Sequence, residues 1–190
     1  KVGEVIDAAD AHDVAAAVSF AADNSMTVAV HATGHGATPV DGTSLLVRTA
    51  GLDTCDIDPD TRTARIGAGI RWQRVIDAAA PYGLAPLCGS APGVGVAGFV
   101  SGGGIGPLVR TVGVSSDYVR AFEVVTGDGR LRRVTADVDP DLFWGLRGGK
   151  ATLGIITEVE VELLPIAQFY GGAVYFDGAD APAVLAQWKR

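Results

Sequence analysis

Residues 91–106, with the sequence APGVGVAGFVSGGGIG, contain seven glycines in sixteen positions. Glycine loses more conformational freedom on folding than other residues, so this density is expected where a backbone closely approaches another backbone or a ligand. A solvated linker would carry Ser, Glu or Lys, whereas large apolar side chains and only one polar one, Ser101, interrupt these glycines. The stretch is therefore interpreted as a close-packed segment and not as a linker.

The composition of 48% apolar and 19% charged residues over 190 residues is typical of a compact protein with one core or two small lobes. The net charge of −7 argues against nucleic acid or an anionic membrane as the main partner, and no apolar run is long enough to cross a bilayer. For the same reason, a phosphate-bearing ligand would have to be bound by local backbone N–H groups.

The two cysteines, Cys55 and Cys88, are too few for a disulfide framework or a zinc site. Both are expected in the core, and a reduced cytoplasm is the simplest setting. The histidines are not spaced with them as metal ligands, so no metal site is predicted. Strand-like sequence begins at once and helical sequence continues to the last residues, so we expect the chain to be part of a longer protein.

The first part of the chain is typical of a small parallel unit. Residues 10–23 have apolar side chains at helical spacing, and Asp10 is a good N-cap for this helix. Strand-like residues 3–8 and 26–31 flank it, and strand, helix, strand is the pattern of a parallel pair. A further short strand is expected at residues 45–47.

The sequence pattern changes near Thr49, and from there on it predicts an antiparallel sheet. Turn sequences separate two pairs of strand-like segments, which predicts two β-hairpins. Residues 154–164, GIITEVEVELL, alternate apolar and charged side chains, as a half-buried antiparallel strand does. The hairpins are expected at residues 54–57 with 63–67 and 119–126 with 131–135, helices at 72–80, 140–146 and from 181, and a last strand at 170–176. Asp139 and Asp180 are expected to cap the two later helices. The fold class is α+β, without a doubly wound sheet.

Two stretches resemble phosphate-binding motifs in sequence but lack features that those motifs require. Gly93-x-Gly95-x-x-Gly98 has the spacing of the dinucleotide fingerprint, but Pro and Gly precede it where a strand is required. The glycines at 102–104 and Pro107 would also break the helix that must follow. Residues 147–150, RGGK, lack the first Gly and the Ser or Thr of a Walker loop. Both interpretations are rejected.

His35 stands between Gly34 and Gly36, directly after the strand at residues 26–31. Backbone amides exposed at such a point can bind a phosphate, and a histidine there faces the ligand that the loop binds. From the residues alone, a histidine that only bonds to its own loop is an equal alternative.

Five segments together resemble the berberine bridge enzyme-like oxidoreductases, which belong to the vanillyl-alcohol oxidase superfamily of FAD enzymes. HATGHG at residues 31–36 is similar to the first flavin loop of that family, and residues 91–106 are similar to its second flavin segment. GVSSD at 113–117, FWGLRGG at 143–149 and GIIT at 154–157 follow in the family's order and spacing.

This resemblance covers nearly the whole chain and implies a PCMH-type FAD-binding domain made of two α+β lobes. The implied boundaries are residues 1–49 for a small βαβ lobe and 50–165 for a larger antiparallel lobe. Residues 166–190 would begin a truncated substrate-binding domain.

The resemblance also implies three groups of FAD-binding residues. The first loop would bind the pyrophosphate, the glycine-rich segment would lie along the ribityl chain and the isoalloxazine ring, and the third segment would contact the adenosine part. They are His31, Ala32, Thr33, Gly34, His35, Gly36 and Ala37; Ala91, Pro92, Gly93, Val94, Gly95, Gly98, Phe99, Gly102, Gly104 and Gly106; and Gly154, Ile155 and Ile156. In such proteins the histidine at the position of His35 is bonded covalently to the 8α-methyl group of the flavin.

Four departures from the family pattern qualify this assignment. Ala91 stands where many members have a cysteine, which predicts at most one covalent link, through His35. Phe99 replaces a histidine of several relatives, and His31 replaces a frequent Arg or Lys that would pair with a phosphate. Lys150 interrupts a run that is often all glycine.

The function implied is the FAD-binding part of a flavin-dependent oxidoreductase. Such an enzyme moves a hydride from an alcohol, amine or sugar-type substrate to flavin N5 and is reoxidised by oxygen. The partners implied are FAD and a small-molecule substrate, with a homodimer left open. The general base in this family comes largely from a later domain, so no catalytic residue is named and the chain alone is expected to be incomplete as a catalyst. A non-covalent flavoprotein reductase or dehydrogenase and a non-catalytic FAD-binding module are the alternatives.

Overall fold

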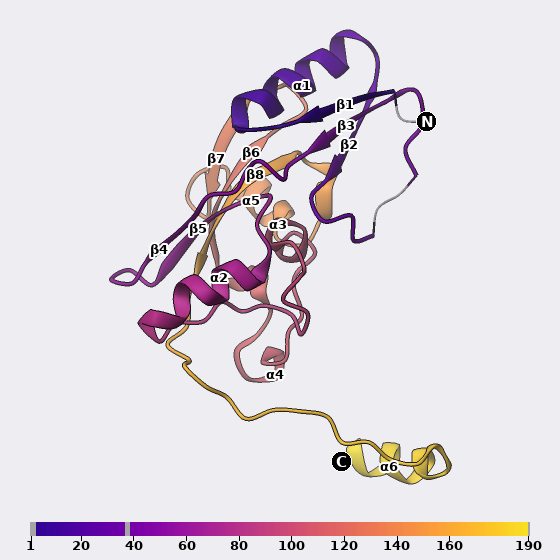
Figure 1. Cartoon of the computed structure of the whole chain (residues 1–190), viewed down its shortest axis with the longest axis vertical. Coiled ribbons are helices and arrows are strands. Elements are labelled where there is room, and N and C mark those ends of the chain that lie inside the picture. The colour runs from indigo at the N-terminus through magenta and orange to yellow at the C-terminus, as the bar shows by residue number, and fades with distance from the viewer. Residues whose placement is uncertain (1–2, 37–38, 190) are drawn as a thin grey trace.

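The computed structural model describes residues 3–36 and 39–189, which form two sheets flanked by helices (Figure 1). The smaller sheet has the order β1-β3-β2 and is entirely parallel. Its strands are β1 (Glu4–Asp7), β2 (Thr27–His31) and β3 (Ser44–Arg48). Helix α1 (Ala11–Asp23) joins β1 to β2, as the strand–helix–strand pattern predicted.

Helix α1 begins at a side-chain cap that the sequence predicted. The Asp10 carboxylate accepts hydrogen bonds from the backbone N–H groups of His12 and Asp13, at 2.8 and 2.9 Å. These bonds satisfy two of the donors that a helix start leaves open. The helix then buries one apolar face, which consists of Val14, Ala17, Val18 and Ala21.

The larger sheet is antiparallel and has the order β4-β5-β8-β6-β7. Its strands are β4 (Cys55–Asp58), β5 (Thr63–Gly67), β6 (Val119–Val125), β7 (Leu131–Thr135) and β8 (Ile155–Glu162). The two predicted hairpins are β4–β5 and β6–β7, and β8 lies between them. Burial alternates along β8, as its sequence predicted, because one face covers the core and the other faces solvent.

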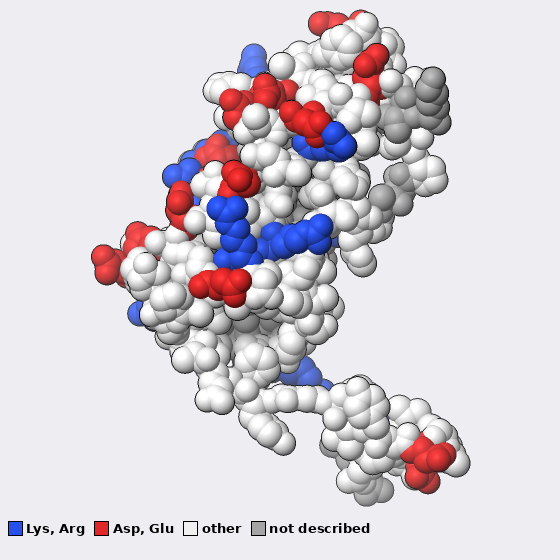
Figure 2. Space-filling model, viewed as in Figure 1, with Lys and Arg blue, Asp and Glu red and all other residues white. Residues whose placement is uncertain are grey.

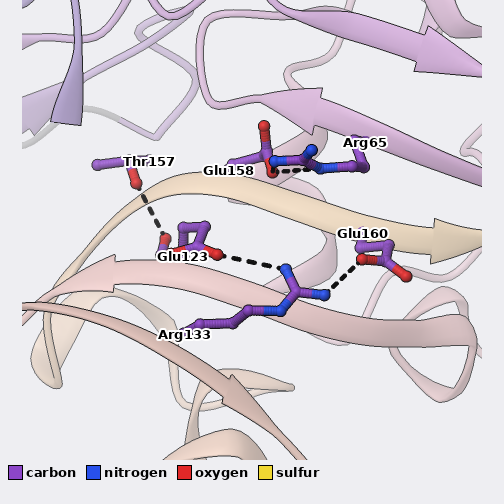
Figure 3. A network of polar contacts seen from close by, with 6 residues as sticks. All are labelled: Arg65, Glu123, Arg133, Thr157, Glu158 and Glu160. Atoms are coloured by element: carbon purple, nitrogen blue, oxygen red, sulfur yellow. Dashed lines mark hydrogen bonds and ion pairs between the residues drawn. The ribbon is translucent and has the colours of Figure 1, made fainter.

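The solvent face of this sheet carries a row of ion pairs (Figure 3). Arg133 on β7 donates to Glu123 on β6 at 3.2 Å and to Glu160 on β8 at 2.7 Å. Arg65 on β5 pairs with Glu158 on β8 at 2.7 Å. The pairs with Glu123 and Glu158 join neighbouring strands, whereas the pair with Glu160 reaches from β7 across β6 to β8, so opposite charges face each other across the sheet. Figure 2 likewise shows acidic and basic side chains interspersed over the face in view.

The remaining helices are short, and the longest of them, α2 and α6, have eight residues each. The α-helices are α2 (Trp72–Ala79), α3 (Val96–Val100), α4 (Val109–Val112), α5 (Pro140–Leu146) and α6 (Ala181–Trp188). Single 3₁₀ turns occupy Ala80–Tyr82, Ser115–Tyr118, Lys150–Thr152 and Gly178–Asp180. None of the helices in the described ranges combines the length and apolar character of a bilayer span.

Two apolar clusters form the core. The first lies between the larger sheet and helices α2, α3 and α5, with Trp72 and Phe122 as its largest fully buried side chains. The second lies under α1, and it also includes Ala97, Val125 and Ile155 from the later part of the chain. The second cluster therefore packs the parallel unit against the larger sheet. The domain boundaries near residues 49 and 165 remain predictions.

Two local predictions were wrong. Residues 170–176 form no strand, and Tyr170 and Tyr175 are fully exposed or nearly so. Their aromatic and β-branched side chains favour a strand only where a neighbouring strand offers pairing, and none does in the described part of the chain. Asp139 and Asp180 stand at the N-cap positions of α5 and α6, but neither side chain makes a capping hydrogen bond.

Candidate cofactor-binding site

The loop after β2 presents a series of backbone N–H groups. Within the described part of the chain, the amides of residues 32–36 donate no hydrogen bond to another residue. Gly34 and Gly36 have left-handed backbones, with φ of +76° and +68°. Successive amides in such a turn point toward a common centre and can bind an anion, which is the property that a phosphate ligand of an acidic protein requires.

The two histidines of this loop have different surroundings. The His31 ring lies over Gly34, where an added Cβ would stand 2.8 Å from Nε2. His35 is exposed and makes no hydrogen bond to another described residue. Among the described residues, the alternative in which His35 only bonds to its own loop therefore has no contact to support it. Ala37 lies outside the described residues.

The glycine-rich segment begins by pairing with the start of α2. Trp72 N–H donates to Val94 O and Val96 N–H donates to Ile70 O, both at 3.0 Å, while Gln73 N–H donates to Pro92 O at 2.9 Å. The segment then forms the five-residue helix α3, which is too short, and follows no strand, to be the helix of a dinucleotide fingerprint. The structure agrees with the rejection of that motif.

The first loop and the glycine-rich segment lie side by side. The position of a Cβ on Gly95 would be 3.1 Å from Cγ2 of Thr33. The sequence separates these residues by a sheet strand, a hairpin and a helix, and the fold brings them into contact. The two segments that the resemblance assigned to the flavin are therefore in contact.

The glycines of the segment fall into two classes. At Gly104 and Gly106 an added Cβ would collide with the protein itself, at 2.8 Å from Phe99 Cε1 and 2.1 Å from Cys88 O respectively. At Gly98 an added Cβ would meet nothing within 4 Å, and the same is true of Gly36 in the first loop. The first class is needed for packing, whereas the second leaves room where a flat ligand could lie against the backbone.

Phe99 is a packing residue in this structure. Its ring contacts Trp72 edge-on, with centroids 5.7 Å apart, and fills space that Gly89 and Gly104 leave. The exposed positions of the segment that the resemblance assigned to FAD are Ala91, Pro92, Gly93, Gly98 and Gly102.

The third segment is part of the larger sheet. Ile155 and Ile156 pair with Val125 and Val124 of β6, and the Ile155 side chain is buried. Gly154 is pressed against Val125 O, 2.7 Å from the position of an added Cβ. Strand β5 pairs only with residues 158–162 of β8, so the edge of residues 154–156 opposite β6 has no strand beside it. The Ile155 side chain therefore belongs to the core and is not available to a ligand.

Sequence reasoning missed two cations that hold the glycine-rich segment. Arg71 Nη1 donates to Gly93 O at 2.6 Å, and Lys150 Nζ donates to Gly98 O at 2.9 Å. No local pattern signals either contact, because the partners are 22 and 52 residues apart. The only sign in the sequence was the lysine within a run of small residues.

The remaining side chains that could bind a metal or act as a reactive thiol add nothing to the candidate site. The described residues contain no group of three or more His, Cys, Asp or Glu that could hold a metal ion. Both cysteines were expected in the core, and both are only partly buried against it, where burial raises the pKa of the Cys55 and Cys88 thiols. At the family's second attachment position the chain has Ala91, so no thiol stands there.

Comparison with known proteins gives consistent matches over the same region. A family described as an FAD-binding domain matches residues 4–135. The chain is 36% identical to (R)-6-hydroxynicotine oxidase of Paenarthrobacter nicotinovorans over 157 residues, which cover 80% of this chain and 34% of that protein. The chain spans about a third of the length of the curated relatives it matches.

Solved structures agree with these matches. The structure of 6-hydroxy-D-nicotine oxidase from Arthrobacter nicotinovorans superposes with a TM-score of 0.80 at 30% identity, covering 86% of this chain and 38% of that one. Glucooligosaccharide oxidase from Acremonium strictum superposes with a TM-score of 0.74 at 29% identity, covering 84% and 34%. That oxidase carries a 6-S-cysteinyl, 8α-N1-histidyl FAD.

Proposed function

We propose that this chain, which belongs to the family of FAD-binding domains, holds the flavin of an FAD-linked oxidase. The observation that carries the proposal is the contact between Thr33 and Gly95, which joins the amide-lined loop to the glycine-rich segment. One surface can then hold both the phosphates and the ring of the same cofactor. The open space at Gly36 and Gly98 fits a ligand that lies against the backbone.

The pyrophosphate end of FAD would be bound by backbone N–H dipoles and not by a free cationic side chain. Arg48 is the neighbour of His31 in the sheet, but Asp7 pairs with its guanidinium and lowers the local positive charge. The amides of residues 32–36 remain, and preorganised N–H groups stabilise an anion without needing net protein charge. His31, which lies over Gly34, is the nearest ring to that group of amides.

When bound, FAD supplies the hydride acceptor and the reaction with oxygen. The contribution of this chain is to bind and orient the cofactor through the first loop and the glycine-rich segment. His35 would form the single covalent link, and its exposed ring, which has no hydrogen-bond partner among the described residues, supports this assignment. The bond would join an imidazole nitrogen of His35 to the 8α-carbon of the flavin.

The substrate class follows from the relatives and is part of the proposal. Their names describe oxidation of a hydroxynicotine and of a glucooligosaccharide, so we propose an amine, alcohol or sugar-type substrate. The general base would lie outside this chain. A peroxide assay of the intact protein with one amine panel and one sugar panel would assign the class. The cytoplasmic setting and the homodimer remain predictions.

Acid precipitation followed by visible spectroscopy tests the cofactor assignment. We expect yellow colour to stay with the precipitated protein, and the His35→Ala variant to release it into the supernatant while still binding FAD before precipitation. His12→Ala, an exposed histidine on α1, is the matched control and should behave as the parent. Release from the parent would favour a non-covalent reductase or dehydrogenase. A protein that stays colourless after incubation with FAD would refute FAD binding.

A further inference from the structure

Lys150 contacts the C-terminal end of helix α3 in two ways. Its Nζ donates to Gly98 O at 2.9 Å, and its backbone N–H donates to Ser101 O at 3.0 Å. Its side chain also runs over Gly102, where an added Cβ would stand 2.5 Å from Nζ. The absence of a side chain at Gly102 therefore makes room for this lysine.

The backbone of Lys150 is held in an uncommon conformation. Its φ of +60° lies in the left-handed region, which a residue with a side chain rarely adopts. Such a conformation persists where the surroundings determine it, and these residues gather at binding sites. Here the two hydrogen bonds to the glycine-rich segment are the contacts that determine it.

The position of the ammonium group has an electrostatic consequence. The last carbonyls of a helix carry partial negative charge, and a cation beside them is favourable. Helix α3 has no side-chain cap at its start, so Lys150 supplies a charged contact only at its other end. Gly98, whose carbonyl accepts the bond, is also a position where an added Cβ would meet no atom within 4 Å.

We infer that Lys150 is a positioning residue for FAD. It fixes the glycine-rich segment in the form that binds the flavin and adds a positive charge beside that segment. The inference rests on the proposed FAD site. It explains why a lysine stands in a run of small residues, and it assigns a role to the one cation that reaches this segment from the turn before β8.

The test uses the intact protein in a His35→Ala background, so that FAD binding is reversible whether or not the natural link forms. Lys150→Met removes the charge, and Lys150→Gly removes it while relieving the left-handed strain. We expect both to weaken FAD binding about tenfold, as the loss of one charge-assisted hydrogen bond implies. Lys150→Arg should restore most of the affinity, because it keeps the charge and the donor.

Two further readouts separate this role from a general effect on folding. Arg62→Met is the matched control, because Arg62 is also an exposed cation with a left-handed φ, +54°, but lies in the β4–β5 turn. It should leave FAD affinity unchanged. The midpoint potential of the bound flavin should fall in Lys150→Gly, because a cation near the ring favours the more negative reduced form. The thermal midpoint of the FAD-free Lys150→Gly protein should match that of the parent.

The possible failures are distinguishable. If the parent binds FAD and both Lys150 variants bind it equally well at an unchanged potential, the role of Lys150 is refuted and the FAD site stands. If the parent itself binds no FAD, the proposed function is refuted and the role of Lys150 with it.

Discussion

Thr33 lies against Gly95, with Cγ2 only 3.1 Å from the position that a Cβ on Gly95 would occupy. This contact joins the end of the parallel unit to the segment that leads into α3. Its closeness means that, at this point, the Thr33 side chain limits how near the first loop and the glycine-rich segment can come.

Enlarging Gly95 should therefore separate the two segments. Gly95 has a φ of −70°, so other residues can adopt its backbone, and only space is limiting. Gly95→Val should displace Thr33 and weaken FAD binding, with a loss of about 1–3 kcal/mol in the free energy of unfolding. Adding Thr33→Ala should recover part of the affinity, which a double-mutant cycle on FAD titrations would measure. Independent effects of the two changes would argue against the contact.

Gly98→Ala should affect stability and binding in opposite directions. Alanine favours a helix over glycine, so the free energy of unfolding of the FAD-free protein should rise by about 0.5–1 kcal/mol. The new methyl group enters the open space on the ligand side, so FAD affinity should fall. Denaturant titration and FAD titration of the same variant measure both. An unchanged affinity would mean that the flavin does not lie over Gly98.

Gly106→Ala is the packing counterpart. Its Cβ would stand 2.1 Å from Cys88 O, and because that oxygen belongs to the backbone and the Cβ is fixed to its own Cα, neither atom can move aside without a backbone shift. We expect a loss of about 2 kcal/mol or more in the free energy of unfolding. A urea melt of the FAD-free protein checks this, and a neutral result would show that the chain at residues 88 and 106 can separate.

Asp128 should contribute to unfolding in acid. The Thr126 hydroxyl, the Arg130 amide and the Arg132 guanidinium stabilise its charged form and lower the pKa of Asp128 to about 2. A carboxyl with a lowered folded-state pKa adds stability above its unfolded pKa, and this is lost as the pH falls from about 4 toward 2. Asp128→Asn should lose less stability than the parent over that interval. Urea midpoints at several pH values measure the difference, and parallel curves would contradict it.

Arg133→Met should weaken the larger sheet modestly. Arg133 bridges Glu123 and Glu160, so its loss leaves two carboxylates on adjacent strands without their shared cation. The side chain is half exposed, so the expected cost is at most about 1 kcal/mol. The cost should shrink in high salt, which screens both the lost attraction and the repulsion that remains. Arg62→Met, at an exposed turn, should show no such salt dependence.

Short-range features of this fold were predictable from sequence. The Asp10 cap, the apolar face of α1 and the alternation along β8 each depend on residues a few positions apart, and each was confirmed. The strand expected at residues 170–176 depended on a distant partner, and it was wrong. The difference is physical, because a helix supplies its own hydrogen bonds whereas a strand needs a neighbour.

The candidate site shows the same difference between short-range features, which the sequence predicts, and long-range contacts, which it does not. Glycine density located the segment, but it could not separate Gly98, which is open, from Gly106, which is packed against Cys88. That distinction depends on chain that arrives from elsewhere in the sequence. The contact of Lys150 with Gly98 spans 52 residues, and no periodicity encodes it.

The place of β8 has a consequence for how the chain folds. Hairpins β4–β5 and β6–β7 can each form from local sequence, yet β8 is the strand that joins them, and it follows both in the chain. During synthesis the two hairpins would have unpaired edges until β8 is made, and such edges are prone to associate with other chains. The search for distant partners slows folding. The pairing of residues 155–162 with both hairpins is thus the step at which the two hairpins become one sheet. The rate of that step determines how long the growing protein exposes edges that can associate with other chains.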